Sequence, residues 1–224
     1  MIKKMELFIV LFAVSSAVSG IKGQEMTVSA GTDIVSSYIW RGQYCGPASV
    51  QPGISLSASN FSLGAWGSTS FDSSWREFDL YAGYSIGNFS ILVTDYFFPR
   101  NLPEGEDNGY FDYSDHVFEA TLGYSFGESF PLSLAWNTNF AGDDDYSSYF
   151  EAAYGITAGS VSIDFILGGT PWGSSYSNGF ALINASVKAS KEITITDSFS
   201  LPVFIQAIVN PDTKDVFLVF GMSF

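Results

Sequence analysis

The C-terminal segment of the chain alternates between large apolar side chains and smaller ones. Within the last ten residues the apolar set consists of Val216, Leu218, Phe220, Met222 and Phe224. An alternation with a period of two residues is the pattern of a β-strand that has one apolar face. A strand of about ten residues is long enough to cross a bilayer when it is tilted. The segment therefore predicts a membrane-spanning strand.

The same alternation recurs along most of the chain and predicts an all-β fold. In residues 76–86, Phe78 and Leu80 share one face while Glu77 and Asp79 share the other. About twelve such segments, bounded by Gly, Asn, Asp or Pro, predict a transmembrane, antiparallel, up-and-down β-barrel. The expected strands span residues 26–41, 49–59, 61–71, 76–86, 89–98, 115–126, 131–141, 147–157, 161–169, 179–189, 199–209 and 215–224.

The connections between the expected strands alternate in length. Those after even-numbered strands are short, as at 87–88 and 159–160, except for the segment around 190–198. Those after odd-numbered strands are longer, and the longest spans 99–114. Short periplasmic turns and long external loops are typical of outer-membrane barrels, and an even strand count places both termini in the periplasm. A soluble β-sandwich shares the alternation of faces but has no reason to sort its loops in this way.

The N-terminal segment has the form of a secretory signal peptide. Basic residues precede a short apolar run over 7–14, and small residues follow it. This run is shorter than the ~20 residues that a spanning helix needs, which argues against the alternative of a membrane anchor. We expect a signal peptide over 1–23, with cleavage between 19 and 23, and the outer-membrane barrel over 24–224.

Composition and charge agree with a barrel. Charged residues make up only 14% of the chain, whereas about 25% is usual for soluble domains. The net charge is −14, and removal of residues 1–23 leaves 6 basic and 22 acidic residues, or −16. Such a chain repels polyanions, so nucleic acid is not an expected partner. Cys45 is the only cysteine and can form no intramolecular disulfide, and no cofactor is expected.

The polar face of the expected strands supplies candidates for the lumen of the barrel. Acidic side chains outnumber basic ones there, which predicts a weakly cation-favouring passage for small solutes or ions. The alternative is an interior filled with paired charges that conducts nothing. Arg41 could bridge lumen carboxylates through two hydrogen bonds, which suits either interpretation. The lumen candidates are Asp33, Arg41, Gln51, Glu77, Asp79, Glu119, Asn137, Asn139, Glu151, Asp164, Lys188 and Gln206.

The two ends of the barrel carry different side chains. Acidic residues in the longer loops, such as Asp143, Asp144 and Asp145, predict a solvated rim that divalent ions bridge to lipopolysaccharide. Their spacing matches no dedicated metal loop, so no bound metal is expected. Aromatic residues gather near both strand ends, where they would form girdles at the two membrane interfaces. The expected outer girdle consists of Tyr38, Trp40, Phe71, Trp75, Tyr96, Phe97, Tyr149 and Phe150. A last strand that ends in Phe224 resembles the signal read by the barrel-assembly machinery.

Residues 26–98 resemble the TorF family of porins. The first expected strand ends in Ser36-x-Tyr38-x-Trp40-Arg41-Gly42, Gln51-Pro52 begins the second, and the third contains Gly64-x-Trp66. The resemblance implies a bacterial outer-membrane β-barrel and, by the family's name, a channel. The chain lacks a constricting loop as long as those of general porins, so wide, nonspecific permeation is not expected.

An enzymatic activity would need a base or a nucleophile. His116 is the only histidine, and strand parity places it on the lipid side with Phe118. A rim hydrolase built on His116 would need a nucleophilic serine and an orienting partner, and the sequence indicates neither. We therefore expect a protein that is not an enzyme. A third possibility besides channel and hydrolase is a structural or surface-interaction barrel.

Overall fold

The computed structural model describes residues 26–99, 109–111 and 115–224. The expected signal peptide over 1–23 and most of the connection 99–114 lie outside the described residues. Within the described part, no helix has the length and apolar character to span a membrane. The strands are β1 (Met26–Val35), β2 (Tyr38–Trp40), β3 (Gln43–Gly46), β4 (Ser49–Ala58), β5 (Phe61–Ser70), β6 (Arg76–Ile86), β7 (Phe89–Phe97), β8 (His116–Ser125), β9 (Leu132–Ala141), β10 (Ser148–Ala158), β11 (Val161–Thr170), β12 (Ala181–Thr196), β13 (Phe199–Asn210) and β14 (Asp215–Ser223).

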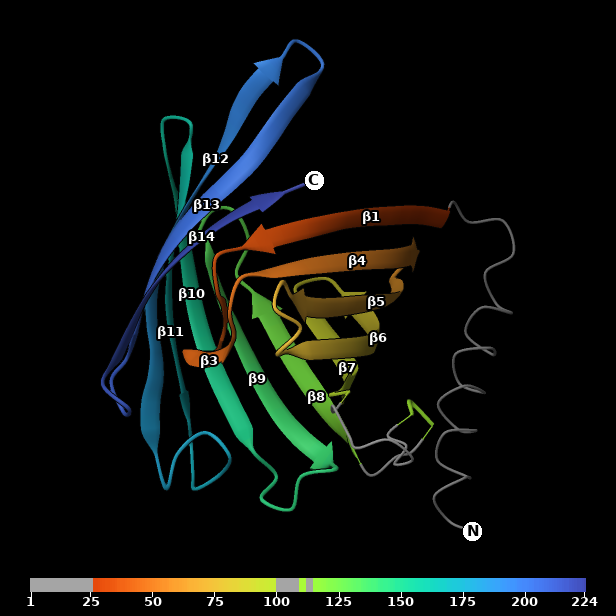
Figure 1. The fold of residues 1–224 in the computed structure, drawn as a ribbon, viewed down its shortest axis with the longest axis vertical. Helices are drawn as coiled ribbons and strands as arrows, with labels where there is room; N and C mark the ends of the chain where they lie inside the picture. The colour runs from red at the N-terminus through yellow and green to blue at the C-terminus, as the bar shows by residue number, and fades with distance from the viewer. Residues whose placement is uncertain (1–25, 100–108, 112–114) are drawn as a thin grey trace.

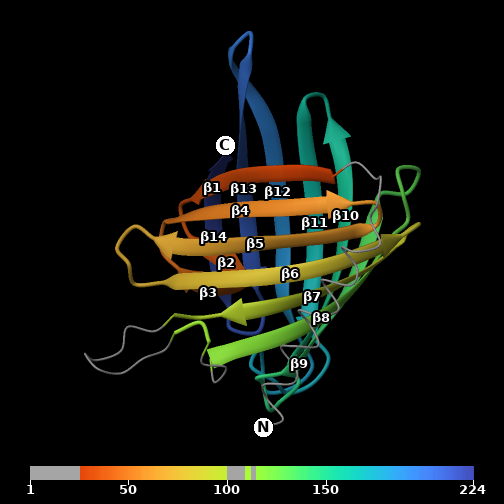
Figure 2. The same cartoon turned by 90° about the vertical axis from the view of Figure 1, so that its right-hand side faces the viewer.

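Twelve of these strands close into one antiparallel barrel, in the order β1-β14-β13-β12-β11-β10-β9-β8-β7-β6-β5-β4. The expected all-β class and the expected antiparallel barrel of twelve strands are therefore confirmed. The barrel closes where β1 pairs with β14, as in Ile34 with Met222, and backbone hydrogen bonds between Thr32 and Phe224 extend this seam. Strands on opposite walls cross one another in Figures 1 and 2, as tilted strands in a barrel do.

The two faces of the barrel wall follow the alternation in the sequence. On β6, Glu77 and Asp79 point inward and are buried, whereas Phe78 and Leu80 point outward and are each 39% exposed. The same division holds on β11, where Phe165 is exposed on the outer face. The interior is thus polar and the outer wall apolar, which is the opposite of a soluble β-sandwich.

The two ends of the barrel differ in the length of their connections. At one end, hereafter the turn end, strands are joined by short segments such as 59–60, 87–88 and 159–160. At the other, hereafter the loop end, they are joined by longer ones such as 36–48 and 171–180. One expectation was wrong: residues 190–198 are not a long connection. β12 continues to Thr196, so a tight turn also joins β12 to β13, and this hairpin projects beyond the wall in Figure 1.

The first expected strand is also shorter than predicted. β1 ends at Val35, and the alternation that continues through Tyr38 and Trp40 belongs to a separate two-stranded sheet, β2–β3. We call residues 36–48 the plug hairpin, because its side chains contact the inner wall of the barrel. Val35 and Ser49, at its two ends, are register partners in β1 and β4. The plug hairpin is therefore an excursion between two adjacent wall strands.

An outward row of aromatic rings lies near the turn end, in agreement with one expected girdle. The rings of Phe61 and Tyr84 are 4.7 Å apart, and those of Phe89 and Tyr124 are 4.6 Å apart. The row continues through neighbouring rings that are 4.9 to 5.8 Å apart, namely Tyr124–Phe126, Phe126–Phe130 and Phe130–Tyr154. Amphipathic and aromatic rings favour a membrane interface, so this row marks one boundary of the apolar belt.

Candidate functional site

The tip of the plug hairpin has a backbone conformation that brings Arg41 into the barrel. Arg41 and Gly42 both have positive φ angles, of 51° and 77°. A Cβ atom at position 42 would collide with the carbonyl group of Ile183, so only glycine fits there. The carbonyl oxygen of Gly42 accepts a hydrogen bond from Asn210 Nδ2 at 3.1 Å. The tip is thus held against β12 and against the loop-end terminus of β13.

Arg41 forms a buried, bidentate ion pair with Glu119 of β8. Its Nη1 lies 2.5 Å from Glu119 Oε2, and its Nη2 lies 2.8 Å from Glu119 Oε1. The side chains of Arg41 and Glu119 are only 10% and 1% exposed. The parallel geometry matches the planar guanidinium to the carboxylate, which is the strongest arrangement for such a pair. Arg41 was expected on the wall of the first strand; its position on the plug hairpin corrects that placement, while the expected bridge to a lumen carboxylate is present.

Aromatic rings surround the Arg41 guanidinium. The guanidinium carbon lies 4.2 Å from the ring centre of Trp40 and 4.7 Å from that of Tyr149. Nη1 also donates a hydrogen bond to the Tyr176 hydroxyl at 2.6 Å, and Tyr96 donates one to Glu119 at 3.0 Å. Burial raises the pKa of Tyr176 to about 12, which keeps its phenol neutral. Cation–π contacts and these hydrogen bonds offset the cost of burying this pair.

Four aromatic residues expected in the outer girdle are therefore lumen residues. Tyr38, Trp40, Tyr96 and Tyr149 all contact groups inside the barrel. The alternation in the sequence could not assign them, because an aromatic side chain suits either a membrane interface or a packed interior.

Apolar contacts complete the seat of the plug hairpin. Ile39 packs against a buried cluster of Val35, Ile208 and Val219 on the inner wall. Trp40 packs against a second cluster that contains Ile183. Ile183 reaches this position because the register between β11 and β12 shifts at Gly168/Gly169. The plug hairpin is thus held by an ion pair, by ring contacts and by apolar packing.

A second acidic group lies on β6, beside Tyr38 at the start of β2 in the plug hairpin. Glu77 Oε1 accepts a hydrogen bond from the Tyr38 hydroxyl at 3.4 Å, and Glu77 Oε2 accepts one from Trp75 Nε1 at 3.2 Å. Asp79 is buried next along the same face, and its Oδ1 has no hydrogen-bond partner among the residues that the structure describes. Burial raises the pKa of the nearby Cys45 thiol to about 12, so Cys45 is not a reactive thiolate.

The other predicted lumen residues point inward but lie apart from these two groups. Asp33 of β1 is paired in register with Gln51 of β4, and Asp164 of β11 with Lys188 of β12. Lys188 Nζ lies 4.1 Å above the ring of Phe204. Three more lumen candidates make hydrogen bonds inside the barrel: Glu151 with Tyr149, Gln206 with Ser186, and Asn137 with Thr121. The structure therefore joins Arg41 to Glu119 and Glu77 to Asp79, and spreads the rest around the wall.

The lumen changes character along its length. Toward the loop end its side chains are buried, as in Ser68, Glu119 and Asn139. Toward the turn end they are exposed and small, as in Ser85 and Ser133. Two aromatic side chains in this wall lie flat over glycines on neighbouring strands, Tyr81 over Gly64 and Phe204 over Gly221. The turn end of the lumen is thus accessible to solvent, whereas the loop end is filled.

The residues behind the TorF resemblance have structural roles in the plug. Tyr38, Trp40, Arg41 and Gly42 belong to the plug hairpin, as described above. Trp66 of β5 lies 5.6 Å, ring centre to ring centre, from Tyr38. Gly64 leaves the space in which the Tyr81 ring lies. All of these positions except Gly64 therefore belong to the hairpin or contact it.

His116 lies on the outer face, as parity predicted, but it has a partner that the sequence did not indicate. Its Nδ1 is 2.6 Å from Asp95 Oδ1, and its Nε2 is 2.7 Å from the carbonyl oxygen of Tyr110. Its ring stacks on Phe97 at 4.9 Å. Asp95 is a charged residue on the apolar face of β7, and that break in the alternation was the available signal. Both ring nitrogens of His116 are occupied by acceptors, so neither is positioned as a free base.

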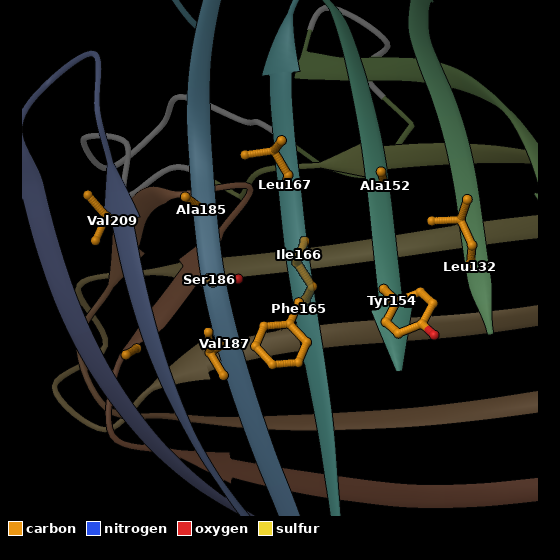
Figure 3. Close-up of a pocket in the computed structure, with 11 residues that line it drawn as sticks. Leu132, Ala152, Tyr154, Phe165, Ile166, Leu167, Ala185, Ser186, Val187 and Val209 are labelled. Carbon is orange, nitrogen blue, oxygen red and sulfur yellow. The ribbon is translucent and has the colours of Figure 1, made fainter. Parts of the chain in front are cut away.

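Two other features lie on the surface of the barrel, an acidic loop and an apolar hollow. Asp143 accepts hydrogen bonds from Asn139, from Ser147 and from the amide of Asp145, which uses its oxygens to order the 142–147 loop. No group of three metal-ligating side chains occurs in the described part of the chain. Figure 3 shows a hollow on the outer face of β9–β13, where Ala152 and Ala185 lie between the larger Phe165, Leu167 and Val187. Its lining is apolar, as expected of a lipid-facing wall.

Two comparisons with known proteins bear on this geometry. A family model described as a bacterial protein of unknown function (Gcw_chp) matches residues 22–170. The matched region includes the plug hairpin, Glu77, Asp79 and Glu119. The description of this family names neither TorF nor porin activity, so both stay predictions. A search among curated proteins found no match.

Proposed function

The chain belongs to the Gcw_chp family of bacterial proteins of unknown function, and we propose that it is an outer-membrane channel for the passive passage of small solutes or ions. In this proposal the turn end and both termini face the periplasm, and the acidic loops face lipopolysaccharide. The terminal strand, ending in Phe224, engages the barrel-assembly machinery. The plug hairpin closes the loop end at rest, and the acidic lumen favours cations when the channel is open.

The outer surface of the barrel supports a membrane location. Leu80, Phe165 and Leu218 are 39%, 45% and 68% exposed on the outer wall. A continuous apolar wall of this kind is a liability in water and the normal surface of a barrel in lipid. The row of aromatic rings near the turn end gives this wall a boundary, as a membrane interface requires.

The plug hairpin is the observation that carries the proposal of a closable channel. The wall strands β1 and β4 pair with each other through Val35 and Ser49, so the wall is complete without the hairpin. The hairpin blocks the lumen through side chains that it brings from outside the wall, above all Arg41. Below it the lumen is polar and solvent-accessible. A lumen that needed only structural filling could have been filled from the wall itself.

Removal of the plug hairpin tests the proposal directly. Because Val35 and Ser49 are neighbours in register, a short Gly/Asn turn in place of residues 36–48 leaves the wall unstrained. Single-channel conductance is measured in planar bilayers under a salt gradient, for the wild type and for this deletion. We expect rare openings in the wild type, frequent discrete steps in the deletion, and a reversal potential that indicates cation preference.

A second candidate function is a non-conducting barrel that serves envelope structure or surface interaction. The density of contacts around Arg41 favours it, because a plug held this firmly need never open. The same experiment separates the two functions. A deletion variant that is folded, by its resistance to protease and its β-sheet spectrum, yet silent in the bilayer would establish the second function and remove the first.

A further inference from the structure

Glu77 and Asp79 form a buried acidic pair that no basic side chain in the described part of the chain balances. They project from the same face of β6, two residues apart, and are 7% and 5% exposed. Neither makes an ion pair among the described residues, and Arg41, which enters the lumen on the plug hairpin, is bound to Glu119 instead. Two uncompensated carboxylates in a buried site are strongly unfavourable, so the pair is neutralised either by protons or by a counter-charge.

The hydrogen bonds of the pair indicate what kind of counter-charge is needed. Both oxygens of Glu77 accept hydrogen bonds, from Tyr38 and from Trp75, which is the pattern of an ionised carboxylate. The Oδ1 atom of Asp79 is fully buried and has no partner. Protonation can remove the charge of a buried carboxylate, but it brings no new donor to this oxygen. A cation satisfies this oxygen and the charge together.

We propose that Glu77 and Asp79 bind a small, hard, divalent cation of the Ca²⁺ type in the lumen. Two carboxylates match a charge of two, and the donors in reach are carboxylate oxygens and the Tyr38 hydroxyl. Ca²⁺ binds such oxygen ligands in flexible geometry at about 2.3–2.6 Å and completes its shell with water. A site with only two carboxylates belongs at the weak end of the range of calcium affinities.

The site lies at the contact between the plug hairpin and the wall. Tyr38 belongs to the hairpin, and its ring lies 5.6 Å from Trp66 of β5 and 6.4 Å from Trp75. A bound cation therefore stabilises the seated hairpin beside the Arg41–Glu119 pair, because only β7 separates β6 from β8. The proposal does not depend on conduction, because a barrel that never opens would keep the same site.

Sensitised terbium luminescence in the folded, detergent-solubilised protein tests this site. Tb³⁺ replaces Ca²⁺ at oxygen sites and emits when a nearby indole is excited, and Trp75 contacts Glu77 directly. We expect a luminescence signal that Ca²⁺ displaces, that Asp79→Asn abolishes, and that Asp164→Asn retains. Asp164→Asn is the matched control because it neutralises a lumen carboxylate on β11, away from β6.

Three results would overturn the proposal. They are the absence of a signal from folded wild type, a signal that persists in Asp79→Asn, and a signal lost instead in Asp144→Asn at the loop rim. Should Asp79→Asn fail to fold, Trp75→Phe locates the site in its place. That variant keeps both carboxylates, so Ca²⁺ binding measured by calorimetry should be retained while the luminescence falls several-fold. Undiminished luminescence in Trp75→Phe would place the ion elsewhere.

Discussion

The two buried acidic groups of the lumen are balanced in different ways. Glu119 receives a bidentate guanidinium, a tyrosine hydroxyl and a covering of aromatic rings. Glu77 and Asp79 receive two neutral donors and leave one carboxylate oxygen without a partner. Both groups face the same plug hairpin, which carries one arginine and delivers it to only one of them. The seat of the hairpin is therefore complete on the β8 side and open to a ligand on the β6 side.

This difference indicates how the loop end of the lumen is closed. On the β8 side the closure is built into the chain and should not respond to the solution. On the β6 side the closure depends on what neutralises the carboxylates. A plug with one fixed side and one conditional side can loosen without unfolding the wall, because neither side contributes to the pairing of the wall strands.

Among the substitutions that distinguish the two acidic groups, loss of Arg41 should have the largest effect on the free energy of unfolding. Arg41→Met leaves Glu119 buried without its partner, and breaking a buried pair in this way costs about 3–5 kcal/mol. We expect a reduction of this size in the free energy of unfolding in detergent, measured by urea titration of tryptophan fluorescence. The double variant Arg41→Met/Glu119→Gln should recover a substantial part, because the unpaired charge is then gone. Equal stability of the wild type and Arg41→Met would show that the pair does not hold the plug.

A substitution at the tip of the plug hairpin should destabilise the seat of the hairpin without altering any charge on the β6 or the β8 side. Gly42→Ala places a methyl group against the carbonyl of Ile183 and forces alanine into a positive φ angle. The left-handed backbone alone costs about 1–2 kcal/mol, and the collision adds to it. Gly87→Ala is the matched control, since φ at Gly87 is 57° and no atom lies within 4 Å of the added methyl. A cost at position 42 no larger than that at position 87 would mean that the tip is not seated against β12.

The faces of the wall could be predicted from the sequence, because a period of two leaves only the choice of which face is inside. That choice placed Glu77, Asp79 and Glu119 in the lumen correctly. The plug hairpin could not be predicted in the same way. Tyr38 and Trp40 continue the alternation of β1, and only tertiary contacts with distant strands decide that the chain turns inward after Val35.

The contacts between the candidate residues also could not be predicted from the sequence. Arg41 and Glu119 are 78 positions apart, and their contact depends on the positive φ angles at the tip of the hairpin. The absence of a partner for Asp79 depends in turn on where Arg41 goes. On the outer wall, the contact of Asp95 with His116 was missed because the sequence alone does not show which side chains of neighbouring strands meet.

The smallest predicted effect comes from removing one tyrosine hydroxyl from each of the two acidic groups. Tyr96→Phe removes one donor from Glu119, which keeps its arginine, and should cost about 0.5–1 kcal/mol. Tyr38→Phe removes one of the two donors of Glu77, which has no arginine, and should cost about 1–2 kcal/mol in buffer free of divalent ions. Saturating Ca²⁺ should raise the stability of wild type and Tyr96→Phe alike, and raise that of Tyr38→Phe by less, because the variant lacks one ligand oxygen. Urea titrations of the three proteins with and without Ca²⁺ measure this. Identical calcium increments in both variants would remove Tyr38 from the cation site while leaving Glu77 and Asp79 in it.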